Sequence, residues 1–186
     1  MASADSHLDG ERILLCVCGG IAAYKSADLV RRLRDAGAQV RVAMTEGATH
    51  FVGATTFQAL SGETVRTSLW DPAAEAAMGH IELARWATRV LVAPATANTL
   101  AKLANGFADN LVTTLCLATT APLVLAPAMN HRMWLHPATQ ANMARLRERG
   151  ARVVGPVDGP LAEGESGPGR MAEPLDIVAA LVAPAA

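Results

Sequence analysis

The chain has 186 residues, which suits one domain large enough to bury a single core without disulfides or a metal ion. Its 16 basic and 17 acidic residues give a formal net charge of -1, and no block of like charges indicates a nucleic-acid partner or an anionic membrane. Hydrophobic residues make up 51% of the chain, yet no run approaches the roughly 20 apolar residues that span a bilayer. We therefore expect a small-molecule or peptide ligand.

The N-terminal segment is polar and acidic. Residues 1–11 lack the basic and apolar regions of a secretory signal, so we expect a flexible tail on a cytoplasmic protein. Three cysteines, Cys16, Cys18 and Cys116, form neither an even disulfide framework nor a CxxC pair. Because free cysteine behaves as a small core hydrophobe, this pattern predicts buried, reduced thiols.

Short apolar runs of strand length alternate with longer helical patterns along the chain. In chain order, the expected elements are a strand at 12–17, a helix at 21–36, a strand at 40–44, a helix at 48–61, a strand at 90–93, helical residues 97–118 with a break near Gly106, a strand at 123–126, a helix at 137–149 and a strand at 152–155. Segment 156–174 is too rich in Gly and Pro to predict regular structure, and a mobile loop over a site is one interpretation.

This alternation is typical of an α/β fold. It predicts a Rossmann-like three-layer sandwich, in which helices cover both faces of a parallel sheet. We expect residues 12–186 to form one such domain. Because ligands of these folds bind at the carboxyl ends of the strands, the turns that follow the strands are the candidate site.

Three of these turns are rich in Gly or hydroxyl residues. Gly19 and Gly20 follow the first strand and allow a tight turn before a helix N-terminus, which can bind an anion. The GxGxxG fingerprint is absent, so a purely structural turn explains this pair equally well. Thr45 and Thr96 follow two further strands and precede helices, which makes each a candidate N-cap. Taken together, the three turns suit a phosphate and a flat polar ring.

The histidines offer one candidate base and no metal site. His80 would be the natural general base, because its ordinary pKa of about 6.5 allows proton exchange near neutral pH. A lone His in an apolar segment is more often structural, and both interpretations stay open. His131 and His136 flank Asn130 without metal-ligand spacing, and no HExxH motif or Cys/His cluster occurs, so we expect no catalytic metal.

Together these residues resemble the homo-oligomeric flavin-containing cysteine decarboxylases, which include phosphopantothenoylcysteine decarboxylase and the peptidyl-cysteine decarboxylases. The resemblance covers residues 12 to about 181. Residues 127–134 match the PxMNxxMW motif, which is highly specific. The further marks are the turn 19–25, the segment around His80, the PxSANT-like segment 94–99, the stretch 108–111 and the lid-like segment 167–171.

The resemblance implies a single flavoprotein domain with FMN and a set of site residues. His80 would be the catalytic base, and the amide of Asn130 would donate a hydrogen bond to the substrate carboxylate. A substrate lid at about 156–174 would contribute Ala162, Glu163 and Met171. The cofactor would be held by Gly20, Ile21, Thr45, Thr96, Ala97, Asn98, Thr99 and Ala128.

The reaction implied is FMN-dependent oxidative decarboxylation of a cysteine residue that bears a free carboxylate. The thiol side chain would be oxidised to a thioaldehyde, and loss of carbon dioxide would give an enethiolate. Family members are trimers or dodecamers made of four trimers, with the flavin at a subunit interface. His80 would therefore serve the FMN of a neighbouring subunit.

One departure from the family pattern bears on the substrate. Phosphopantothenoylcysteine decarboxylases usually carry an Ala-Cys-Gly lid sequence, whose Cys donates the proton that completes reduction to a saturated thiol. This chain has Ala162, Glu163 and Gly164 there, and we expect no fused synthetase domain of the kind usual in bacterial coenzyme A enzymes. Both observations favour the C-terminal Cys of a precursor peptide as substrate, with an enethiol as product.

Two alternatives stay open beside the peptide substrate. The lid-like segment 167–171 is closer to the coenzyme A branch, which keeps phosphopantothenoylcysteine as a substrate of this chain in coenzyme A biosynthesis. The third candidate is a non-catalytic flavoprotein regulator of a phosphatase, which would keep the FMN residues without turnover.

Overall fold

The computed structural model describes residues 7–71, 79–160 and 164–183, and its centre is a five-stranded parallel sheet. The strands are β1 (Arg12–Val17), β2 (Gln39–Met44), β3 (Arg89–Ala95), β4 (Leu123–Pro127) and β5 (Arg152–Val153). They lie in the order β2-β1-β3-β4-β5. All five strands expected from the sequence are present, and the sheet is parallel throughout, as predicted.

The strand order reverses beside β1. The chain passes from β1 outward to β2 and then returns to the other side of β1, where β3 pairs with it. The connections that leave β1 and β3 therefore diverge to opposite faces of the sheet. A crevice at the carboxyl ends of the strands follows from this topology, and it is the usual ligand site of doubly wound folds.

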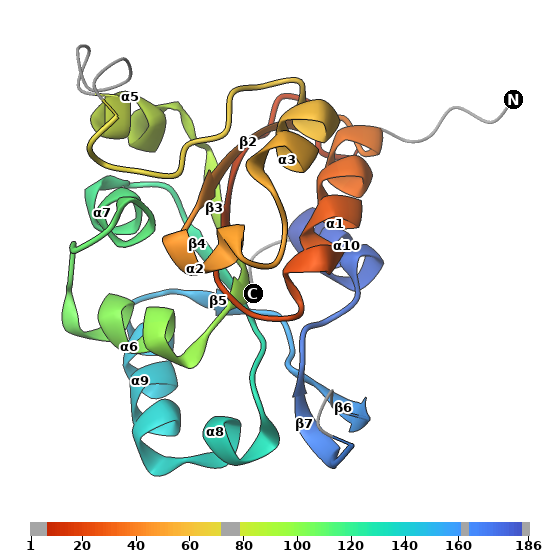
Figure 1. The fold of residues 1–186 in the computed structure, drawn as a ribbon, viewed down its shortest axis with the longest axis vertical. Coiled ribbons are helices and arrows are strands. Elements are labelled where there is room, and N and C mark those ends of the chain that lie inside the picture. The colour runs from red at the N-terminus through yellow and green to blue at the C-terminus, as the bar shows by residue number, and fades with distance from the viewer. Residues whose placement is uncertain (1–6, 72–78, 161–163, 184–186) are drawn as a thin grey trace, which may run out of the picture.

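Helices cover both faces of the sheet, which confirms the predicted three-layer sandwich. On one face, α1 (Ala23–Asp35) packs against α3 (Ala54–Ser61) and α10 (Pro174–Val182). The other face carries α5 (Gly79–Trp86), α6 (Ala97–Asn105), α7 (Leu111–Ala118) and α9 (Pro137–Glu148). Figure 1 shows these two groups on either side of the strands. In the part of the chain that the structure describes, no helix is both long and apolar enough to cross a membrane.

The side chains of β1 show why both faces need cover. Ile13, Leu15 and Val17 belong to the core beneath α1, whereas Leu14 and Cys16 belong to the core on the opposite face. All of these side chains are fully buried, as expected for a central parallel strand with period-2 alternation.

The segment 156–174 is more regular than the sequence indicated. Val157–Pro160 forms β6 and Ser166–Arg170 forms β7, and the two strands pair in an antiparallel hairpin. The expectation that this segment lacks regular structure is therefore wrong. The pairing depends on the backbone rather than on β-favouring side chains, and β7 is supported by contacts with α8 (His131–Leu135). In Figure 1 the hairpin projects beyond the sheet beside α8.

The other differences concern short elements and the N-terminal segment. The single helix expected at 48–61 is divided into α2 (Glu46–Thr49) and α3, and neither α8 nor α10 was anticipated. Residues 7–11 do not belong to a flexible tail, because Leu8 is buried and its N–H donates to the Ala36 carbonyl at 2.9 Å. Glu11 is also fixed there by an ion pair with Arg89 at 2.8 Å.

Candidate cofactor and substrate site

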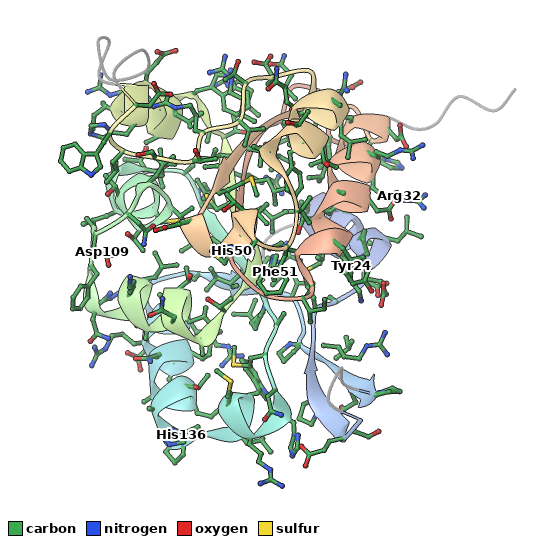
Figure 2. The ribbon with its side chains drawn as sticks, in the orientation of Figure 1. Tyr24, Arg32, His50, Phe51, Asp109 and His136 are labelled. Atoms are coloured by element: carbon green, nitrogen blue, oxygen red, sulfur yellow. The ribbon has the colours of Figure 1, made fainter. Side chains whose placement is uncertain are left out.

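A cavity of about 1120 Å³ lies at the carboxyl ends of β1, β2, β3 and β4. It is somewhat larger than the roughly 300–1,000 Å³ of ordinary small-molecule sites, so it has room for a cofactor and a substrate together. Figure 2 shows its breadth, since Tyr24 on α1 and Asp109 on the α6–α7 connection both line it and lie well apart.

The two glycines after β1 have different roles. A Cβ atom on Gly19 would lie 2.6 Å from the carbonyl carbon of Gly47, so Gly19 lets the turns after β1 and β2 pack backbone to backbone. A Cβ atom on Gly20 would meet only the Thr96 methyl, at 3.8 Å, and Gly20 lines the cavity. No side chain caps the start of α1 at Ala22, but the Ala23 N–H donates to the Gly20 carbonyl at 2.9 Å and the Lys25 N–H donates to the Ala22 carbonyl at 3.0 Å. The start of α1 therefore borders the cavity mainly with the positive end of its helix dipole.

Thr45 and Thr96 are both N-caps and both line the cavity. The Thr45 hydroxyl accepts a hydrogen bond from the Ala48 N–H at 3.3 Å, and the Thr96 hydroxyl accepts one from the Thr99 N–H at 3.3 Å. Capping therefore accounts for both residues without excluding a ligand. A hydroxyl that caps a helix uses an acceptor lone pair, and the Thr45 proton can still be donated to an anion in the cavity.

Asn130 is held in a defined orientation at the opposite wall. Its side-chain oxygen accepts a hydrogen bond from the Arg132 N–H at 2.8 Å and caps α8. This bond fixes which end of the carboxamide is the oxygen, so the amide nitrogen is a donor of known placement. The neighbouring Met129 N–H donates to the Gly169 carbonyl at 2.9 Å, which joins the Asn130 turn to the hairpin.

The hairpin lies against this turn through glycines. A Cβ atom on Gly169 would lie 2.2 Å from the Met129 carbonyl oxygen, and one on Gly167 would lie 3.1 Å from the His131 Cβ. Glu165 makes an ion pair with Arg132 at 3.2 Å, and its carboxylate lies 3.2 Å from Nδ1 of His131. The hairpin thus borders the cavity where a lid was predicted. Ala162 and Glu163, which we expected to touch the substrate, lie outside the described residues.

The charged groups of the cavity are arranged in pairs. Lys25 makes an ion pair with Glu173 at 2.6 Å, and Arg170 contacts the same carboxylate at 3.3 Å. On the other side, Lys102 is paired with Asp109, and its hydrogen bond holds the pKa of that carboxyl below its ordinary value. Positive groups therefore occur at both ends of the cavity.

Two of the three cysteines are deeply buried and uncharged. Cys16 and Cys18 are fully buried, as predicted, and Cys116 is half-buried. Burial raises the pKa of the Cys18 thiol to about 12, although a hydrogen bond with Thr99 opposes this shift. A hydrogen bond with Cys116, followed by burial, raises the pKa of Cys16 well above its ordinary value. Neither thiol is therefore an activated nucleophile.

The structure brings most of the predicted site residues to this one cavity. All eight residues expected to hold FMN line it, and so do Asn130 and Met171. The sequence did not single out several other lining residues, namely Lys25, Lys102, Asp109, Asn110, Met133 and Arg170. All but Lys102 lie within the segments on which the resemblance rests. Across the described ranges, no group of three or more His, Cys, Asp or Glu side chains could hold a metal ion.

His80 is the exception among the predicted residues. It is half-buried on α5 and does not line the cavity of its own chain. In Figure 1, α5 lies beside α7, far from the hairpin and α8. A role for His80 in catalysis would therefore require the cavity of another subunit.

The fold and the site together define a doubly wound α/β protein with a large cavity at its switch point. The chain belongs to the Flavoprotein family, whose model matches residues 1–185. The resemblance drawn from the sequence is confirmed by this match.

Known proteins of similar sequence and structure fall in the same group. The chain is 56% identical over 176 residues to the coenzyme A biosynthesis bifunctional protein CoaBC of Escherichia coli, which covers 95% of this chain and 43% of that protein. It therefore spans less than half the length of this relative. A PPC decarboxylase mutant complexed with pantothenoylaminoethenethiol superposes with a TM-score of 0.81 at 35% identity, covering 92% of this chain and 96% of the other. The FMN-dependent cysteine decarboxylase SpaF gives a TM-score of 0.82 at 33% identity, covering 94% and 97%.

Proposed function

We propose that the protein is an FMN-dependent decarboxylase of phosphopantothenoylcysteine. The observation that carries this proposal is one cavity that joins an anion cradle at the strand ends to the oriented carboxamide of Asn130. The similarity to CoaBC and to PPC decarboxylase supports the choice of substrate. The peptide substrate that the sequence favoured is less well supported than this alternative.

The residues of the cavity fit FMN. The positive end of the α1 dipole would attract a phosphate, the Thr45 hydroxyl would donate to it, and Gly20 leaves space beside them. Ala97, Asn98 and Ala128 border the same space with small or amide side chains, which suit a flat polar ring. When bound, FMN would supply the electron acceptor for oxidation of the cysteine thiol.

Asn130 would orient the substrate. Because its side-chain oxygen is occupied by the Arg132 N–H, the amide nitrogen can donate to one oxygen of the cysteine carboxylate. Such a contact positions the carboxylate for loss of carbon dioxide, and the hairpin beside Met129 helps to exclude water. Met171 would line the substrate side of the same space.

His80 would act as a base on a neighbouring subunit. We propose that the protein is a homo-oligomer, a trimer or a dodecamer of trimers, in which α5 of one subunit faces the cavity of the next. The position of His80 away from its own cavity supports this arrangement. An imidazole is the side chain best suited to removing the thiol proton near neutral pH.

The peptide substrate stays a second candidate because of one residue. Glu163 occupies the lid position where phosphopantothenoylcysteine decarboxylases usually have the Cys that completes reduction. An enzyme without that donor would release an enethiol, and SpaF, a structural neighbour, is an FMN-dependent cysteine decarboxylase.

Mass spectrometry of the products tests the proposal. Flavin-saturated protein is incubated with phosphopantothenoylcysteine and, separately, with a peptide that ends in Cys. Loss of carbon dioxide from the first substrate alone supports the proposal, and the mass also shows whether two hydrogens are lost with it. Conversion of the peptide alone would overturn it in favour of the second candidate. Turnover of neither substrate would favour a non-catalytic flavoprotein.

The role of His80 is tested by pairing two inactive variants. His80→Asn should lower the rate by about 10²–10⁴-fold while FMN stays bound, because proton transfer is lost. Asn130→Ala should be inactive for a different reason, the loss of substrate orientation. If the site is shared between subunits, co-refolding the two variants should restore part of the activity, since some cavities then receive both intact residues. No recovery in mixed oligomers would contradict a shared site.

A further inference from the structure

The wall of the cavity nearest the hairpin carries two cations and one carboxylate. Lys25 and Arg170 both line the cavity, and both contact Glu173, at 2.6 Å and 3.3 Å. One carboxylate facing two cations leaves this wall with an excess of positive charge. The wall near Lys102 differs, because its cation is matched by Asp109, and the acidic Glu46 belongs to the turn after β2.

Arg170 lies across the hairpin. A Cβ atom on Gly159 would lie 2.7 Å from Nη1 of Arg170 and 3.2 Å from its Cδ, so the side chain crosses the hairpin directly over Gly159. The φ of +150° at Gly159 also favours glycine. At the base of the side chain, Met171 is buried in the core and its carbonyl accepts a hydrogen bond from Lys25 at 3.3 Å.

The tip of Arg170 is nonetheless accessible. Its side chain is 37% exposed, and its contact with Glu173 is made through Nη2. A guanidinium has five N–H donors in a planar fork that matches phosphate oxygens, and a fork already held in place loses little freedom on binding. Arg170 therefore combines charge, fixed geometry and access.

We propose that Arg170 binds a phosphate monoester on the substrate and that Glu173 and Lys25 are positioning residues for it. This inference rests on the proposed function and deepens it, because it assigns the wall that recognises the phosphorylated end of the substrate. That end is separate from the cysteine carboxylate, which Asn130 would hold. A phosphate monoester carries about −1.5 to −2 charges at neutral pH and so matches the excess positive charge of this wall.

The test compares substrates that differ only in the phosphate. The kcat/KM values for phosphopantothenoylcysteine and pantothenoylcysteine are measured with flavin-saturated protein, for the unaltered chain, Arg170→Gln and Arg170→Lys. Arg32→Gln is the matched control, because Arg32 on α1 also pairs with a carboxylate at 3.3 Å, that of Asp28, but does not line the cavity. Flavin absorbance and circular dichroism check that each variant is folded and loaded.

Arg170→Gln should lower kcat/KM for the phosphorylated substrate by about 10-fold or more, mainly through KM, because charged hydrogen bonds are lost. The value for pantothenoylcysteine should stay within about twofold, and Arg170→Lys should recover part of the loss. Equal losses for both substrates, or no loss for either, would overturn the inference while leaving the proposed function intact.

A binding measurement separates this inference from the reaction itself. If the unaltered protein turns over neither substrate, the proposed function fails, and calorimetry with phosphopantetheine and pantetheine still tests Arg170. The inference requires tighter binding of the phosphorylated ligand, with the difference removed in Arg170→Gln. Equal affinity for the two ligands would overturn it.

Discussion

The floor of the cavity and the hairpin that borders it are built in opposite ways. The floor, made of the turns at 18–22, 45–49 and 94–98, rests on buried strand ends and on direct backbone packing between Gly19 and Gly47. The hairpin, residues 157–160 and 164–170, is half-buried or exposed apart from the buried Gly169, and Glu165 joins it to α8 through a surface ion pair with Arg132 and a contact with His131. The floor thus has one rigid shape, which suits binding of the same cofactor whatever the substrate. The hairpin is the part in which substrate preference can change without loss of the fold.

The largest effect is expected at the contact that couples the hairpin to the site. A methyl group on Gly169 would lie 2.2 Å from the Met129 carbonyl oxygen, so Gly169→Ala must displace the turn that carries Asn130. A misplacement of about 1 Å in a reacting group can lower the rate by roughly 10²-fold. We expect kcat/KM to fall by about that factor, with FMN affinity nearly unchanged because the floor is not touched.

Gly53→Ala serves as the control for this variant. A Cβ atom on Gly53 would have no atom within 4 Å, and its φ of −69° suits alanine. Activity close to that of the unaltered protein is expected there. If Gly169→Ala instead lost FMN while keeping its rate in excess FMN, the hairpin would belong to the cofactor site, and the division between floor and hairpin would be wrong.

A smaller effect, on stability rather than on rate, is expected in the floor. A methyl group on Gly19 would overlap the backbone of Gly47, and overpacking of this kind lowers the free energy of unfolding by about 1–3 kcal/mol. Gly20→Ala is the matched change, since its methyl group would meet only Thr96 at 3.8 Å. It should leave the flavin-free protein as stable or slightly more stable, because it restricts the unfolded chain.

Urea unfolding and FMN titration together distinguish these two glycines. Gly19→Ala should shift the unfolding midpoint of the flavin-free protein to lower urea, whereas Gly20→Ala should weaken FMN binding without that shift. Equal stability losses in the two variants would show that the turn after β1 is a structural turn only.

The sequence predicted the floor better than the hairpin for a physical reason. Strands such as β1 are continuous apolar runs because both faces are buried, and Thr45 and Thr96 stand just before helices, so local pattern was enough to locate them. β6 and β7 contain Gly159 and Pro168, residues that disfavour strands, and their pairing is supported by contacts with α8 that no local pattern contains.

The charged residues of the site were missed for a similar reason. Arg170 and Glu173 are close in sequence, but Lys25 reaches the same carboxylate from α1, so their shared role appears only after folding. His80 illustrates the opposite case, because its motif identified it although its own chain does not bring it to the cavity.

The last effect is a pH dependence of stability that is absent near neutral pH and involves the floor. Cys18 is buried directly after β1, and burial raises its pKa to about 12, whereas the thiol of the unfolded chain titrates near about 8.5. Between these values the unfolded chain releases a proton that the folded protein retains. The free energy of unfolding should therefore fall as the pH rises above about 8.5, by at most about 1.4 kcal/mol per pH unit from this thiol, and should not depend on it at lower pH. In Cys18→Ala the free energy of unfolding should fall less steeply with pH between pH 9 and 11 (roughly the window set by the two pKa values).

The comparison needs a variant that removes buried atoms without removing a titrating group. Val17→Ala serves, because Val17 is fully buried beside Cys18 and carries no proton to lose. Both variants should be less stable than the unaltered protein at pH 7, since each leaves a small cavity. Only Cys18→Ala should lose less stability than the unaltered protein as the pH is raised, measured by urea unfolding at each pH. If the free energy of unfolding falls with pH equally steeply in the two variants, the loss of stability at alkaline pH arises from other groups. The stability of the floor would then not depend on an uncharged Cys18.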